Sequence, residues 1–291
     1  MRVCKFGGSS LAHSRGFRNA ASTITSNPQR RVAVFSAPGA RERGDEKITD
    51  VLFRIGERAG KGQSFFREKK VLTERFCSIE SDLTNDTLIS QEFLRSIERR
   101  IERGTAELVS MGEEFSCRVM LAYMRQEGIN AGMFDPARDL PVTRDENGST
   151  YVAVSDMPGI SVVLESLLGS HDIVCAPGFY GNENRQRRLF ARGGSDYTGA
   201  VLAMAINAER YEKMTDVDGI MDSDPAKNKD AKVIGSIDYL QLALMTGSGC
   251  GVVQNEAVEL MLNSGIRMQV MNSFDPLGDG TMVYSRLGEV A

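Results

Sequence analysis

Histidine is scarce in this chain: only His13 and His171 occur among its 291 residues. A Ser-His-Asp or Cys-His hydrolase needs a histidine base beside its nucleophile, and neither histidine lies in such a motif. We expect His13 early in a helix and His171 just before a strand. Any chemistry that the chain performs must therefore work without a histidine base.

Long apolar runs, paired cysteines and basic tracts are missing as well. No stretch approaches the ~20 apolar residues that span a bilayer, and residues 1–6 are too short and polar for a signal peptide. No basic run is long enough to track nucleic-acid phosphates, and the net charge is −4. These absences predict a cytoplasmic protein that binds neither membranes nor nucleic acid. Five scattered cysteines, without disulfide or zinc spacing, indicate reduced thiols: Cys4, Cys77, Cys117, Cys175 and Cys250.

The composition is that of a globular protein, with 41% apolar and 25% charged residues. Strand and helix patterns alternate, which predicts an α/β fold: a three-layer α/β/α sandwich with a mostly parallel central sheet. Ligands of such sheets bind at the carboxyl ends of the strands. We expect one domain with an N-terminal lobe over about 1–185 and a C-terminal lobe over about 186–291. The expected strands are 2–6, 31–35, 129–134, 172–176, 211–215, 266–271 and 281–284.

The expected helices begin with one that Ser9 or Ser10 caps and that runs to about Thr25. A polar loop is expected over 136–150 and a turn over 177–188. The remaining helices are expected near 48–59, 64–82, 90–103, 112–127, 158–169, 195–207, 237–246 and 254–263.

Two Gly-Gly-Ser turns stand beside basic residues. In the first, Lys5-Phe6-Gly7-Gly8-Ser9-Ser10, glycines let the backbone approach an anion while Lys5 adds a point charge. A tight strand-to-helix turn with a capping serine explains that motif equally well. The second turn, residues 192–196 (Arg-Gly-Gly-Ser-Asp), again precedes a helix, and Arg192 can grip a carboxylate with a bidentate fork. The pair is hard to explain as turns alone.

Two further segments are candidates. Thr215-Asp216-Val217-Asp218-Gly219-Ile220 leaves a strand, where Thr and Asp suit nucleotide or metal contacts, although a polar turn has the same composition. Ser110-Met111-Gly112-Glu113-Glu114 opens a helix and also reads as a capping box.

Together these motifs resemble those of aspartate kinases, within the wider amino-acid kinase fold. The resemblance spans nearly the whole chain and keeps the motif order. The specific part is RGGSD with TDVDGI. The full series is KFGGSS, SAPG with Ile48-Thr49-Asp50, SMGE, PGFYG, RGGSDYT and TDVDGI.

The resemblance implies a role for each motif residue. Two residues would be catalytic. Lys5 would act on the migrating phosphoryl group, and Asp196 would orient Lys5 and help to place a metal. Glu113 would meet the substrate ammonium and Arg192 its α-carboxylate. The nucleotide would be held by Lys5, Gly7, Gly8, Ser9, Thr215, Asp216, Met221 and Lys227. L-Aspartate would be held by Ser36, Thr49, Glu113, Arg192, Gly193, Gly194 and Ser195.

The implied substrates, ATP with Mg²⁺ and L-aspartate, fit the lack of a histidine base. A free aspartate side chain has a pKa of about 3.9, so it is already an ionised nucleophile at pH 7. Catalysis then needs positioning and charge stabilisation. The resemblance also implies an acceptor side in the N-terminal lobe, a nucleotide side in the C-terminal lobe, a homodimer, and a possible separate regulatory subunit. We expect no regulatory ACT domain after Tyr284.

The chain departs from the family pattern in the nucleotide lobe. Met221 stands where Tyr is common, Ala226 where Arg is common, with Lys227 beside it, and Gly251 where Lys is common. Gln254-Asn255 replaces a His-Pro pair. Two alternatives therefore stay open: a kinase of another small carboxylate or carbamate acceptor, and a non-catalytic nucleotide-binding regulatory subunit.

Overall fold

The computed structural model describes residues 1–291 except 192, 224–227, 229, 248–252, 276 and 286–291. Its centre is an eight-stranded sheet in the order β10-β12-β11-β9-β1-β2-β6-β3. Every neighbouring pair is parallel except β11 with β12. These strands are β1 (Arg2–Phe6), β2 (Arg30–Phe35), β3 (Ala131–Met133), β6 (Ile173–Pro177), β9 (Arg210–Thr215), β10 (Ser236–Asp238), β11 (Arg267–Asn272) and β12 (Thr281–Tyr284).

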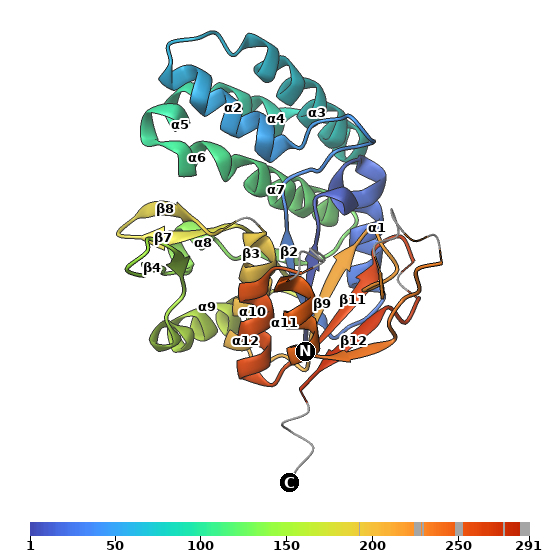
Figure 1. The fold of residues 1–291 in the computed structure, drawn as a ribbon. Helices are drawn as coiled ribbons and strands as arrows, with labels where there is room; N and C mark the ends of the chain where they lie inside the picture. The colour runs from blue at the N-terminus through green and yellow to red at the C-terminus, as the bar shows by residue number, and fades with distance from the viewer. Residues whose placement is uncertain (192, 224–227, 229, 248–252, 276, 286–291) are drawn as a thin grey trace.

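Helices cover both faces of this sheet (Figure 1). One face carries α1 (Ser14–Thr25), α2 (Ile48–Gly60), α3 (Phe66–Thr84), α4 (Leu88–Arg95), α5 (Ile97–Arg103), α6 (Thr105–Val109) and α7 (Met111–Gln126). The other carries α9 (Met157–Ser170), α10 (Gly194–Ala205), α11 (Tyr239–Gly247) and α12 (Asn255–Ser264). The three-layer sandwich expected from the alternating pattern is confirmed.

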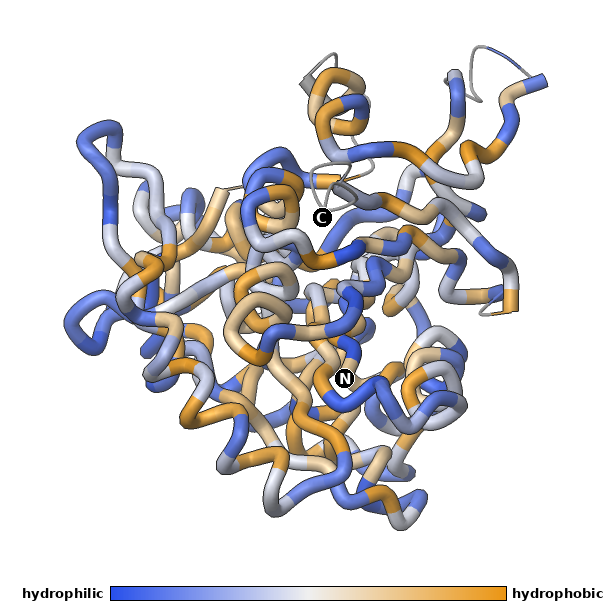
Figure 2. The backbone as a smooth tube through the Cα atoms, turned by 90° about the horizontal axis from the view of Figure 1, so that it is seen from below, coloured by the Kyte–Doolittle hydropathy of each residue, from blue (hydrophilic) through white to orange (hydrophobic). Residues whose placement is uncertain are grey.

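Side-chain alternation along the strands divides the core into two. In β1, Val3 packs with the α9–α12 layer, whereas Cys4 and Phe6 pack with the α1–α7 layer. Because successive strand residues point to opposite faces, Lys5 shares the face of Val3, and Lys213 in β9 shares the face of Tyr211. Figure 2 shows hydrophilic segments at the outer loops and hydrophobic stretches through the interior.

Several local expectations were wrong. Ser9–Leu11 forms a 3₁₀ turn, His13 is extended, and α1 begins only at Ser14 with no side-chain cap. Ser10 caps no helix, and its hydroxyl accepts a hydrogen bond from the Ser273 hydroxyl at 2.8 Å. The expected helix over 90–103 is two helices, α4 and α5, which meet at Ser96.

Two segments expected to be irregular contain short elements. The polar loop holds the one-turn helix α8 (Pro136–Asp139) and the strand pair β4 (Thr143–Arg144) and β5 (Thr150–Tyr151). The turn near 180 is a hairpin of β7 (Tyr180–Glu183) and β8 (Gln186–Leu189). The remaining 3₁₀ turn is Val154–Asp156.

The two proposed lobes contribute equally to one sheet, whose halves join where β1 pairs with β9. Residues 184 and 185 form the turn of the β7–β8 hairpin. The halves are therefore continuous through backbone hydrogen bonds, and the assignment of an acceptor side and a nucleotide side stays a prediction.

A buried ion group joins β1, β2 and β9 on the α1 side. Glu212 is fully buried, and its carboxylate accepts from Arg30 Nε at 2.6 Å and from Arg2 Nη1 at 3.1 Å. Burial raises the pKa of the neighbouring Cys4 thiol well above its usual value. Burying a carboxylate of this kind has a large desolvation cost. Its loss leaves the partner cations buried without a charge partner.

We predict that Glu212→Ala lowers the free energy of unfolding by about 3–5 kcal/mol, because Arg30 is left buried without its charge partner. Glu209→Ala is the matched control, since Glu209 contacts Arg2 at 3.4 Å but is 46% exposed; it should cost no more than about 1 kcal/mol. Denaturant unfolding measures both, and equal losses would contradict the prediction.

Candidate active site

The loops that follow β1, β2 and β6 meet at the carboxyl edge of the sheet. The Gly39 amide donates to Gly8 O at 2.8 Å, and a Cβ on Gly39 would lie 2.5 Å from the Gly8 carbonyl carbon. The Gly178 amide donates to Phe35 O at 3.0 Å, and a Cβ there would lie 2.6 Å from the Ser195 Cβ. Only glycine permits these backbone contacts. They bring the first Gly-Gly-Ser motif, the SAPG segment and the start of α10 into one cluster of loops.

Asp196 lies between two lysines in this cluster. Lys5 and Lys213 are register partners on β1 and β9. Lys5 Nζ lies 2.6 Å from Asp196 Oδ1, and Lys213 Nζ contacts Oδ2 of the same carboxylate. The three residues are only 6%, 6% and 4% exposed for Lys5, Lys213 and Asp196. The predicted contact between Lys5 and Asp196 is therefore present, with a second cation that the sequence reasoning did not name.

Electrostatics keep Asp196 ionised. Burial by itself raises the pKa of this carboxyl, but the charges of Lys213 and Lys5 and their hydrogen bonds lower it to about 2. Burial also lowers the pKa of Lys213, against the attraction of Asp196. Two ammonium groups facing one carboxylate leave one positive charge in excess beside a glycine turn, which suits a phosphate group.

The first glycine turn is only partly free to bind an anion. The Gly7 amide donates to Met214 O at 3.1 Å, so it closes the β1–β9 edge instead of facing a ligand. Among the residues predicted there, the amides of Gly8 and Ser9 are better placed for a phosphate. Ser36 follows β2, and its amide donates to Phe6 O at 3.2 Å.

Glu113 lies in the first turn of α7 and is almost fully buried. Burial raises its pKa to about 8, although backbone N–H groups of Ala37 and Glu113 and the charge of Lys5 act in the opposite direction. Its Oε2 atom is buried without a hydrogen-bond partner. A buried, unpaired carboxylate oxygen is costly, and a ligand ammonium would satisfy it.

The other predicted residues differ in burial and in their hydrogen-bond partners. Gly193 has a φ of +88° and precedes α10, whose first turn holds the buried Ser195. Thr215 ends β9 and donates to Asp216 Oδ1 at 3.1 Å, while Met221 forms an isolated bridge with Val233. Thr49 is half-buried in the first turn of α2. Arg192 and Lys227, together with the departures at Ala226 and Gly251, lie outside the described residues.

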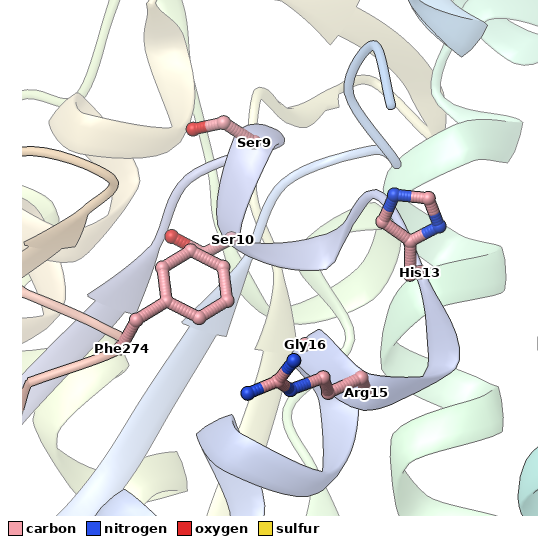
Figure 3. A pocket seen from close by; sticks show the side chains of 6 residues that line it. All are labelled: Ser9, Ser10, His13, Arg15, Gly16 and Phe274. Atoms are coloured by element: carbon pink, nitrogen blue, oxygen red, sulfur yellow. The ribbon is translucent and has the colours of Figure 1, made fainter. Parts of the chain in front are cut away.

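A cavity of about 600 Å³ lies beside the first glycine turn (Figure 3). It shares only Ser9 with the residues predicted to bind nucleotide, and neither Lys5 nor Lys213 lines it. Figure 3 shows the Phe274 ring and Arg15 on one side of it and His13 on the other. The lining residues are Ser9, Ser10, His13, Arg15, Gly16 and Phe274.

Lys213 is the residue that the sequence reasoning missed. A signal was present: Glu212 and Lys213 are adjacent charges between the apolar residues Tyr211 and Met214 of a strand, Arg210–Thr215. Charged side chains almost never occupy such positions unless they are paired. The identity of the partner depends on strand order and register, which the local sequence does not reveal.

Mg²⁺ can be tested against the donors present. Among the described residues, no group of three or more His, Cys, Asp or Glu side chains could hold a metal ion. Mg²⁺ commonly needs only one or two carboxylates together with substrate phosphates and water, so a metal that arrives with a nucleotide does not require such a group. Within the same residues, no helix is long and apolar enough to cross a membrane.

Comparison with known proteins agrees with this geometry. A model described as the amino acid kinase family matches residues 1–272. The chain belongs to this family. It is 29% identical to aspartokinase 3 of Bacillus subtilis (strain 168) over 294 residues, which cover 98% of this chain and 64% of the relative.

Solved structures give the same relationship. The aspartate kinase of Clostridium acetobutylicum has a TM-score of 0.85 and 30% identity, covering 99% of this chain and 64% of that one. Aspartokinase III of E. coli, solved in complex with aspartate and ADP, has a TM-score of 0.86 and 28% identity, covering 98% and 64%. The chain thus spans about 64% of the length of each of these relatives.

The raised pKa of Glu113 predicts a pH dependence of stability. Between pH 4.5 and about 8 the folded protein holds a proton on Glu113 that the unfolded chain has released. Stability must therefore fall as pH rises through this window, by about 1.4 kcal/mol per pH unit at most, and level off above it. Unfolding of wild type and Glu113→Gln at several pH values measures the difference. If the stability of the wild type relative to the variant stayed constant or rose with pH, the raised pKa of Glu113 would be contradicted.

Proposed function

We propose that this protein transfers the γ-phosphoryl group of ATP to the β-carboxylate of L-aspartate. The observation that carries the proposal is one loop cluster holding the buried Lys5–Asp196–Lys213 group and the unpartnered carboxylate of Glu113. The lysines suit phosphate, and Glu113 suits an ammonium. The relatives named as aspartate kinases, one of them solved with aspartate and ADP, support the same pair of substrates.

In this proposal the acceptor needs no base, because its carboxylate is already ionised at neutral pH. Lys5 and Lys213 stabilise the charge that develops on the transferring phosphoryl group, and Asp196 holds both ammonium groups in place. Glu113 and Arg192 bind the ammonium and α-carboxylate of aspartate. Mg²⁺ would neutralise charge on the phosphate oxygens when bound, and Asp196 is the residue that the resemblance assigns to placing it.

Binding of aspartate also changes the protonation of Glu113 in this scheme. A pKa of about 8 keeps Glu113 largely protonated at pH 7, and a neighbouring ammonium favours the ionised form. The assignment of acceptor and nucleotide sides to the two lobes, the homodimer and the separate regulatory subunit remain predictions from the resemblance.

ADP release by the wild-type protein with ATP and a panel of acceptors tests the proposal. L-Aspartate should support turnover, whereas succinate, which lacks the ammonium, and asparagine, which lacks the side-chain carboxylate, should not. Turnover with succinate equal to that with aspartate would indicate another carboxylate acceptor. ADP release that does not respond to any acceptor would contradict the proposed reaction.

Lys5→Ala and Lys213→Met should each lower kcat by ~10²–10³ while the protein stays folded, because each removes a cation that stabilises transition-state charge. Steady-state kinetics give kcat, and circular dichroism checks the fold. If Lys213→Met kept near-normal turnover, Lys213 would be only a structural partner of Asp196.

A further inference from the structure

Outside the lysine pair, a second group of charges links two elements that flank the acceptor site. Arg187 belongs to β8 of the hairpin, and its side chain reaches the beginning of α7. Its Nη1 donates to Glu114 Oε2 at 2.7 Å and to Ser110 Oγ at 2.8 Å. Its Nε lies 3.4 Å from Glu107 Oε2. One guanidinium thus contacts α6, the first turn of α7 and the residue that separates these helices.

Arg100 completes this group from α5. Its Nη2 donates to the same Glu114 oxygen at 3.0 Å. Glu114 is therefore shared by two arginines, and all these side chains are mostly buried. Burial by itself raises the pKa of Glu114, but the charges of Arg187 and Arg100 outweigh it and leave the pKa below its usual value. Glu114 is ionised at neutral pH, and it holds both guanidinium groups through the same Oε2 atom.

This ion group holds the β8 side of the hairpin, while β7 also pairs with residues 140–142 through the backbone of Asn182. A lone two-stranded hairpin is only marginally stable in water, and β8 has no fully buried residue. Arg187 supplies contacts in two directions, since its guanidinium also lies 4.8 Å from the centre of the Tyr180 ring on β7. Tyr180 is fully buried, so ring and guanidinium stack within the interior.

The anchored elements are those predicted to hold the two ends of an amino acid. Glu114 directly follows Glu113 on α7, and Gly194 follows Arg187 by seven residues. Between them, the Phe190 amide donates to Phe179 O at 2.9 Å, which ties the chain after β8 to the chain before β7. A shift of the hairpin relative to α7 would change the separation between the Glu113 carboxylate and that turn.

We propose that Arg187, through Glu114, is a positioning residue that fixes the spacing between the ammonium and carboxylate sites for the acceptor. It does not touch the acceptor itself. This inference rests on the proposed function, because it assigns Glu113 and the second glycine turn to the two charged groups of an α-amino acid. Arg187 then sets affinity for the acceptor while leaving the nucleotide side unchanged.

Arg187→Lys is the first test, since it keeps the charge but loses the fork that reaches Glu114, Ser110 and Glu107 together. The KM for aspartate should rise by on the order of tenfold or more, because small misplacements of binding groups have large effects. The KM for ATP should stay within about twofold, because the partners of Arg187, which are Ser110, Glu107 and Glu114, are not among the residues predicted to bind nucleotide. A purely stabilising residue would lower the melting temperature without this split.

Arg188→Ala is the matched control. Arg188 lies next to Arg187 on the same strand, but its Nε donates to Glu183 Oε2 at 2.7 Å and its Nη2 to Gln186, both within the hairpin. Removing it takes an arginine from the same strand without touching α7, so aspartate KM should not change. Glu114→Gln should raise the aspartate KM as Arg187→Lys does, and the double variant should be no worse than either single one.

Hydrogen exchange provides a readout that needs no substrate. Amides of residues 110–114 should exchange faster in Arg187→Lys and at the wild-type rate in Arg188→Ala. Unchanged exchange and unchanged aspartate KM in Arg187→Lys, or equal rises in the KM for aspartate and ATP, would overturn the inference. If the wild type does not use aspartate, the proposed function fails separately, and exchange at 110–114 still decides whether Arg187 holds α7.

Discussion

Lys5 and Lys213 stand side by side on neighbouring parallel strands, where their like charges would repel each other in a place that water hardly reaches. Asp196, presented by the first turn of α10, lies between them with one carboxylate oxygen toward each ammonium. Buried like charges are tolerated only with such compensation. The register of β1 with β9 and the docking of α10 against this face therefore depend on one another.

The glycine contacts follow from the same constraint. For Asp196 to reach both lysines, α10 must begin at the carboxyl edge of the sheet, and the loops after β2 and β6 must pass it closely. Gly39 and Gly178 allow that passage. In the proposed function, the excess positive charge that remains would bind phosphate, and the unpaired Glu113 oxygen would accept the ammonium group of the acceptor. Charge balance would then separate a phosphate-binding region from an ammonium-binding region within one site.

The sequence predicted those features that local patterns encode. Alternating strands and helices gave the three-layer fold, and the two Gly-Gly-Ser turns marked the ends of β1 and the start of α10. Contacts between residues far apart in the chain could not be predicted from the sequence. Lys213 reaches Asp196 only because β9 pairs with β1, and Arg187 reaches Glu114 only because a hairpin, which had been read as a turn, folds back on α7. Ser10, expected as a cap of α1, instead bonds to Ser273, more than 260 residues away.

The central claim is that the phosphoryl group ends on a carboxylate of aspartate. An acyl phosphate reacts with hydroxylamine to give a hydroxamate, whereas inorganic phosphate and phosphate esters do not. Incubation of the wild-type protein with ATP, Mg²⁺, L-aspartate and hydroxylamine should therefore yield aspartyl hydroxamate in step with ADP. ADP that accumulates with inorganic phosphate and no hydroxamate would contradict the account.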